Sequence, residues 1–143
     1  MGTRANRVVH MYDLSSVLEF EALEEVRPGS SILLSGPAMT GKEQLAYDLL
    51  ADGAREGDGA VVVTTSDKAE NVATEFRDRV PELENSQLGV VDCRGEGGSE
   101  SGVIDGVSVH QVSSPGDLTG IGIGITKALE GLHNSGRTRG RLA

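Results

Sequence analysis

Apolar residues are grouped along the chain in short continuous runs. Residues 32–35 and 88–92 are two such runs, and residues 60–65 form the most strongly β-branched one. Runs of this length are typical of strands that are buried on both faces, as in a parallel sheet. Residues 107–112 instead alternate apolar and polar positions, which predicts a strand with one exposed face. The pattern therefore predicts four strands.

Helical stripes lie between these runs. Residues 41–55 carry apolar side chains on one face at helical spacing. A second helix is predicted from Ser66 or Asp67, either of which can cap it, to Pro81, which stops it. Residues 118–133 also include an alternation of isoleucine and glycine that suits a strand, but their helical stripe is longer and favours a helix with packing glycines.

The ends of the chain differ from this regular alternation. Residues 1–26 are predicted to be a loose N-terminal arm followed by a short amphipathic helix that begins after Asp13 or Ser15. Residues 27–143 are predicted to form one α/β domain, a parallel sheet flanked by helices. Residues 93–106 are rich in glycine and indicate a flexible loop or an excursion at the edge of the sheet.

The last part of the chain contains three arginines: Arg137, Arg139 and Arg141. This run favours a solvated loop before a strand, although such arginines can also contact phosphate or act on a neighbouring subunit. Since apolar residues resume only at the very end, we expect the next strand to be missing.

A glycine-rich loop stands between the first predicted strand and its helix. It contains Gly36, four further residues, Gly41 and Lys42, which is the spacing of a phosphate-binding P-loop. In such a loop, backbone N–H groups surround a phosphate, the helix N-terminus adds its dipole, and the lysine reaches the β- and γ-phosphates. The candidate nucleotide-binding residues are Gly36, Pro37, Ala38, Met39, Thr40, Gly41, Lys42 and Glu43.

Glu43 stands where a P-loop normally has the serine or threonine that ligates Mg²⁺. Its carboxylate lacks a hydroxyl and would repel the nearby phosphates, although a first-turn acid also stabilises the helix dipole. We expect ATP to be the possible cofactor, with binding weak or independent of Mg²⁺, and we expect no metal site and no catalytic residue.

Composition narrows the class of protein further. The formal net charge is -9, and only 3 of the basic residues are lysines, so we expect no general binding to nucleic acid. An acidic, lysine-poor surface resembles that of proteins from salt-loving archaea. There is no signal-peptide pattern and no apolar stretch of the about 20 residues that a membrane helix needs. We therefore expect a cytoplasmic protein without membrane association.

Other candidate chemistry is weak. Cys93 is the sole cysteine, so it forms no internal disulfide. Its neighbour Arg94 could lower its pKa, but a structural thiol is favoured. His10, His110 and His133 lack a second ligand at helical spacing, which argues against a metal site.

Residues 27–42 resemble the RecA-like superfamily, specifically the KaiC-like ATPases, whose P-loop is entered through a similar Gly-Ser and apolar run. Residues 114–122 also look like haloarchaeal relatives labelled HTR-like. The resemblance implies a RecA-like P-loop NTPase core. The chain departs from it at Thr65 and Ser66, where the family has two glutamates that activate water, and it lacks the Walker B strand, which would begin near Leu142.

Two interpretations follow from these departures. The chain is either part of a longer RecA-like protein or a truncated, degenerate relative, so its core is expected to be incomplete. In both cases the sheet lacks a strand unless another chain supplies it, which predicts self-association or a partner protein. The expected function is ATP binding in a signalling or regulatory role, with hydrolysis by this chain alone disfavoured. The alternative is a non-catalytic interaction or regulatory protein that keeps the fold without binding nucleotide.

Overall fold

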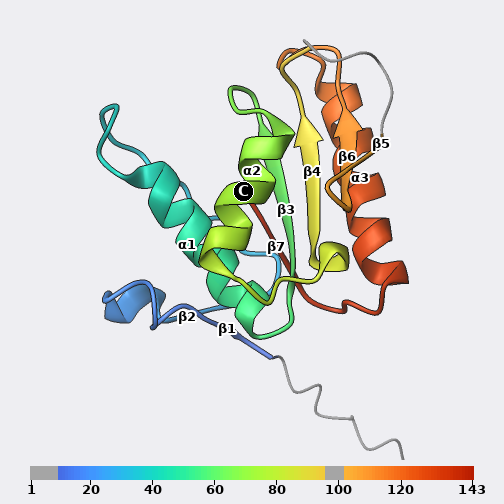
Figure 1. Cartoon of the computed structure of the whole chain (residues 1–143). Coiled ribbons are helices and arrows are strands. Elements are labelled where there is room, and N and C mark those ends of the chain that lie inside the picture. The colour runs from blue at the N-terminus through green and yellow to red at the C-terminus, as the bar shows by residue number, and fades with distance from the viewer. Residues whose placement is uncertain (1–9, 96–101) are drawn as a thin grey trace, which may run out of the picture.

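The computed structural model describes residues 10–95 and 102–143. Within them the main sheet has five strands in the order β5-β6-β4-β3-β7 (Figure 1). Strands β6, β4, β3 and β7 are parallel to one another, and β5 is antiparallel to β6. These strands are β3 (Gly59–Thr64), β4 (Leu88–Asp92), β5 (Gly102–Ile104), β6 (Val107–Gln111) and β7 (Gly140–Leu142).

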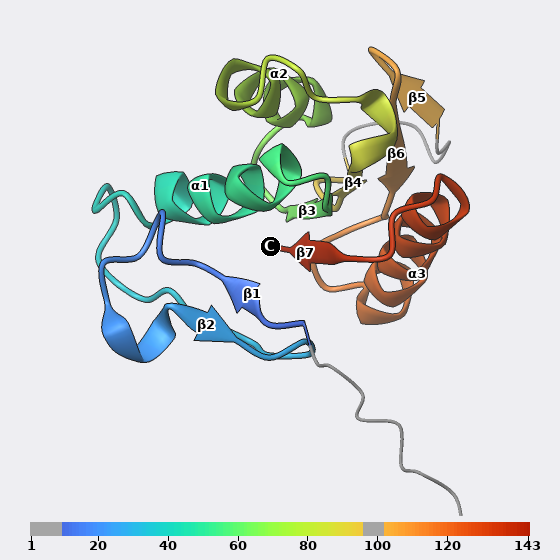
Figure 2. The same cartoon turned by 90° about the horizontal axis from the view of Figure 1, so that it is seen from below.

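Helices cover both faces of this sheet. Helices α1 and α2 lie on one face, and α3 lies on the other (Figure 2). Their bounds are α1 (Lys42–Arg55), α2 (Ala69–Arg79) and α3 (Leu118–Asn134), and a short 3-10 helix η2 (Asn85–Gln87) precedes β4. The predicted class, an α/β protein with a parallel sheet flanked by helices, is confirmed in this form.

The alternation of side chains along β3 explains the two cores. Val61 points to the α3 face, where it packs with Val91 and Leu132, and Val62 points to the opposite face, where it packs with α2. Val61 and Val91 are fully buried, as expected for central strands with helices on both sides. Gly124 of α3 lies so close to Val91 that an added Cβ would stand 2.9 Å from it, which confirms the expected packing role for this glycine.

Most regular elements agree with the sequence predictions. The predicted strands at 60–65, 88–92 and 107–112 correspond to β3, β4 and β6, and the three predicted helices of the domain correspond to α1, α2 and α3. The expected cap of α2 is wrong, because its N-cap residue is Lys68, without a side-chain cap. Asp67 contributes instead its backbone N–H, which donates to Thr64 Oγ1 at 2.8 Å.

The predicted amphipathic helix before residue 26 is wrong. The segment instead forms a two-stranded ribbon of β1 (Tyr12–Asp13) and β2 (Glu25–Val26), with a 3-10 turn, η1 (Glu21–Leu23), between them. Of its apolar residues only Leu14 is buried, whereas Phe20 is 60% exposed. A helix would have no apolar surface against which to bury the rest of its stripe.

The predicted strand at 32–35 is also wrong. These residues have no strand assignment, and Leu33 is 89% exposed rather than buried on both faces. The physical reason is the lack of a neighbouring strand. A groove of about 590 Å³, lined by Ile32, Leu34, Leu49 and Leu142, separates the segment from the outer edge of β7.

The C-terminal arginines were expected in a solvated loop before a strand. A strand does follow, but the arginine side chains are not solvated, since they are only 10–32% exposed. They flank and enter β7, which pairs with β3 from Gly59↔Gly140 to Val61↔Leu142. Arg141 lies over α1, where its guanidinium contacts Asp52 at 3.2 Å, and Arg137 contacts Glu84 at 2.5 Å. The largely buried contact of Arg141 with Asp52 ties the last strand to α1. Of the two alternatives for residues 93–106, the described part agrees with the excursion at the sheet edge, because residues 102–104 form the edge strand β5; residues 96–101 lie outside the described residues.

Candidate functional site

The glycine-rich loop lies at the edge of the sheet where the parallel strands end. Helix α1 runs antiparallel to β3, so its amino end and the loop that precedes it lie at the level of the carboxyl end of that strand, to one side of the sheet (Figure 1). In open α/β sheets, ligands bind at this edge. The structure therefore brings the predicted residues 36–42 to the edge where binding sites form.

The loop has a backbone shape that depends on its sequence. Gly41 has a φ of 84° and ends the loop in the left-handed region, where glycine is favoured, and Met39 also has a positive φ of 62°. Thr40 Oγ1 donates to the carbonyl oxygen of Pro37 at 2.8 Å and closes the turn. A Cβ on Gly36 would stand 3.2 Å from this hydroxyl, so glycine also suits the start of the loop.

Lys42 folds back across this loop. Its Nζ donates to the carbonyl oxygen of Gly36 at 3.1 Å and to that of Pro37 at 3.0 Å. The loop residues around it are exposed, and Met39 is fully so. The ammonium group is thus held at the mouth of an open loop, without a carboxylate partner among the described residues.

The amino end of α1 is not capped by a side chain. Its N-cap residue is Gly41, which has no side chain to accept from the first N–H groups of the helix. Helix α3 differs, because Asp117 Oδ1 accepts from the Gly120 N–H at 2.9 Å. The first turn of α1 thus presents free N–H groups together with a lysine, which is the combination that binds a phosphate.

A crevice of about 200 Å³ opens beside the first turn of α1. It is lined by Glu43 on the helix and by Thr65, Ser66 and Asp67 after the end of β3. The structure therefore brings Glu43 close to Thr65 and Ser66, the two positions at which the KaiC-like ATPases were expected to have glutamates. Asp67 was expected to cap α2, and the sequence analysis did not place it in a crevice. Its position shortly after a buried strand could have indicated this, because ligands of open α/β sheets bind where the strands end.

Tyr47 forms the floor of this crevice, one turn after Glu43. Its pKa is raised, first by burial and then by the negative charges of Asp67, Glu75 and Glu43, while Arg79 acts in the opposite direction. The ring packs edge-on against Phe76, with ring centroids 5.6 Å apart. The crevice is thus a place where negative charge accumulates beside an apolar wall.

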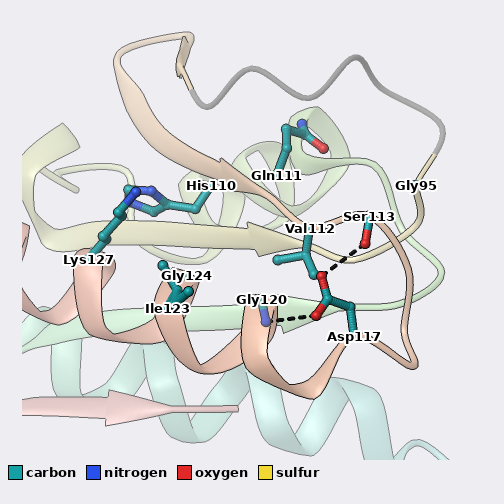
Figure 3. Close-up of a pocket in the computed structure, with 10 residues that line it drawn as sticks. All are labelled: Gly95, His110, Gln111, Val112, Ser113, Asp117, Gly120, Ile123, Gly124 and Lys127. Atoms are coloured by element: carbon teal, nitrogen blue, oxygen red, sulfur yellow. Dashed lines mark hydrogen bonds between the residues drawn. The ribbon is translucent and has the colours of Figure 1, made fainter.

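A second pocket, of about 440 Å³, lies between the end of β6 and α3 (Figure 3). Ser113 donates to Asp117 at 2.9 Å, and the pKa of Asp117 is lowered by the Gly120 N–H and by this hydroxyl. The pKa of His110 is lowered by burial and by the charge of Lys127. The acidic side chain of this pocket, Asp117, is engaged as the N-cap of α3, so its role in this arrangement is structural.

The remaining candidates do not form reactive sites in the described residues. Among these residues no group of histidine, cysteine and carboxylate side chains has the arrangement of a metal site. Cys93 is fully buried, and its pKa is raised by burial and by Asp92 and Asp117. Arg94 does not lower this pKa as the sequence allowed, because its guanidinium pairs with Asp92 at 2.8 Å.

These features define an α/β protein with an exposed, lysine-bearing glycine loop at the carboxyl edge of its sheet. The chain belongs to a family of unknown function, DUF7504, whose model matches residues 29–142 and so includes the whole loop and the crevice. Neither a curated protein nor a solved structure matches the chain. Of the helices in residues 10–95 and 102–143, none is both long enough and apolar enough to cross a membrane.

Proposed function

We propose that the loop from Gly36 to Lys42 binds the phosphates of a nucleotide, with ATP as the first candidate. The observation that carries the proposal is the loop itself. Its lysine is held over the mouth by two carbonyl oxygens, and an uncapped helix begins directly behind it. Backbone N–H groups, a helix dipole and one ammonium group are the elements that bind a phosphate chain in P-loop proteins.

The proposal extends to a RecA-like core of the KaiC-like type. It is supported by the order of loop, helix α1, strand β3 and helix α2 in the domain and by the sequence of residues 27–42. Such a protein would act as a cytoplasmic signalling or regulatory module rather than as an efficient ATPase. Thr65 and Ser66 stand in the crevice where a carboxylate would have to activate water, and neither is a base at neutral pH.

Replacement of Lys42 by alanine tests this proposal. The variant loses a charge-assisted bond to phosphate that is worth about 1.5–3 kcal/mol, so affinity for a fluorescent ATP analogue should fall by about 10- to 150-fold. The titration is made in molar salt, with and without Mg²⁺. Lys127→Ala is the matched control, because this lysine is exposed on α3, across the sheet from the loop, and it should leave the affinity within about twofold.

Two results would contradict the proposal: no binding by the wild-type chain, or equal binding by the wild type and Lys42→Ala. Either would favour the alternative, a non-catalytic interaction protein that keeps the fold and binds no nucleotide.

We further propose that a second copy of the chain pairs with the outer edge of β7. The groove beside this edge contains apolar side chains of Ile32, Leu34 and Leu142. Leu142 is 49% exposed, and the extended residues 32–35 of the same chain have no strand partner. One copy thus offers both an open edge and an apolar extended segment, which suits a reciprocal exchange between two identical chains.

Light scattering at low and at molar salt measures this association. We expect a mass above that of the monomer for the wild type. Leu142→Lys should shift the mass toward the monomer, because it places a charge on the edge. Leu118→Lys is the control, because it places the same charge at a leucine of α3 that is 78% exposed and lies outside the groove, and it should have no effect. A monodisperse wild-type monomer at both salt concentrations would rule the association out.

A further inference from the structure

The crevice beside the proposed phosphate loop carries two carboxylates and no cation. Glu43 enters it from the first turn of α1, and Asp67 enters it from the segment after β3. Lysine, arginine and histidine are absent from its described lining. Both acids are exposed to solvent, so a ligand that enters the crevice would meet them.

The position of Glu43 in the loop indicates which part of a nucleotide its charge would meet. It directly follows Lys42, and in a P-loop the side chain at this position lies beside the last phosphates of a triphosphate, where it normally holds the metal. A phosphate chain that is held by the loop and continues past the first turn of α1 therefore enters the crevice. Its terminal phosphate would face Glu43 from one side and Asp67 from the other.

The environment of Tyr47 provides independent support for this charge arrangement. Its pKa is raised in part by both Asp67 and Glu43, so the fields of the two acids overlap at one point of the crevice. Arg79 is the cation that approaches the Tyr47 ring, with its Cζ 5.2 Å from the ring centroid. Its Nε is paired with Asp48 at 3.1 Å and its Nη1 with Glu75, so its charge is already balanced.

We infer that this site selects a nucleoside diphosphate over a nucleoside triphosphate, and that Glu43 and Asp67 are the residues that set this preference. The inference rests on the proposed binding of nucleotide by the loop. A diphosphate fills the loop and leaves the crevice empty. A triphosphate brings additional negative charge between two carboxylates, where like charges repel.

The test compares fluorescent analogues of ADP and ATP in the presence of EDTA, with the wild type and with Glu43→Gln, Asp67→Asn and the double variant. The wild type should bind the diphosphate at least about 10-fold more tightly. Each single substitution should raise triphosphate affinity several-fold and leave diphosphate affinity within about twofold. Glu70→Gln is the matched control, since it removes one exposed charge near the start of α2 without lining the crevice.

The possible failures are distinguishable. If neither nucleotide binds, the proposed function fails and the inference fails with it. If both bind equally, or if the substitutions alter both affinities alike, the loop binds phosphate but the carboxylates do not set selectivity. The same titrations are then repeated with Mg²⁺ in place of EDTA. If the wild type then prefers the triphosphate and Glu43→Gln abolishes that preference, the two acids hold a metal ion and the inference is overturned.

Discussion

Replacing Phe76 by alanine is expected to lower the free energy of unfolding by about 3–5 kcal/mol, the usual range for a large aromatic side chain removed from a core. Phe76 is fully buried between α2 and the sheet. It also packs edge-on against Tyr47, the residue under the crevice. The substitution leaves a cavity that the neighbouring strands fill only in part, because strand positions are fixed by their backbone ladder.

Urea denaturation followed by circular dichroism measures this change. The control is Phe20→Ala, which removes the same side chain from a position that is 60% exposed and should cost no more than about 0.5 kcal/mol. Similar losses for both variants would show that α2 is not packed on the sheet as described.

The second large effect is expected for Arg141→Ala, at about 3 kcal/mol. The Arg141 guanidinium lies 3.2 Å from Asp52 and 3.7 Å from Asp58, and it also donates to the Leu49 carbonyl oxygen at 2.7 Å. Its side chain is 10% exposed, and those of the two aspartates are 12% and 10% exposed. Removing the arginine leaves Asp52 without its guanidinium partner and Asp58 with Arg139 alone, and both carboxylates are largely shielded from water, which is destabilising.

Arg137→Ala is the matched control for this variant. Its partner Glu84 is 69% exposed, and solvent-exposed pairs contribute about 0–1 kcal/mol. Thermal unfolding of both variants at low and at molar salt separates the two cases. Equal, small losses would mean that the cluster around Arg141 does not hold β7 on the sheet.

Much of the fold follows from local patterns. The runs that became β3 and β4 are apolar until their last residues, Thr64 and Asp92, because both of their faces are covered. The helical stripe of α3 is long enough to prevail over the competing alternation of isoleucine and glycine. These elements carry their own signal, since their burial depends on spacing within one segment. The loop at Gly41 and Lys42 is equally visible, because its geometry depends on a few adjacent residues.

The failures share another cause, dependence on distant partners. The run at 32–35 has the composition of a strand, but a strand requires a neighbour, and residues 32–35 have none. The contacts of Arg141 with Asp52 join positions 89 residues apart, which no local pattern reveals. The approach of Asp67 to Glu43 likewise requires β3 and α1 to pack first, so the crevice was not predicted from the sequence.

The two hydrogen bonds from Lys42 to the loop have a consequence for ligand exchange. A phosphate that enters must compete with the Gly36 and Pro37 carbonyl oxygens for the same ammonium protons. The free energy gained on binding is therefore the difference between the new hydrogen bonds and those that are lost. The entropy lost on ordering the loop is small, because hydrogen bonds already hold the empty loop in place. Such a site favours moderate affinity and rapid exchange of the bound ligand. Its occupancy would then follow the surrounding ligand concentration, in contrast to a permanently held prosthetic group.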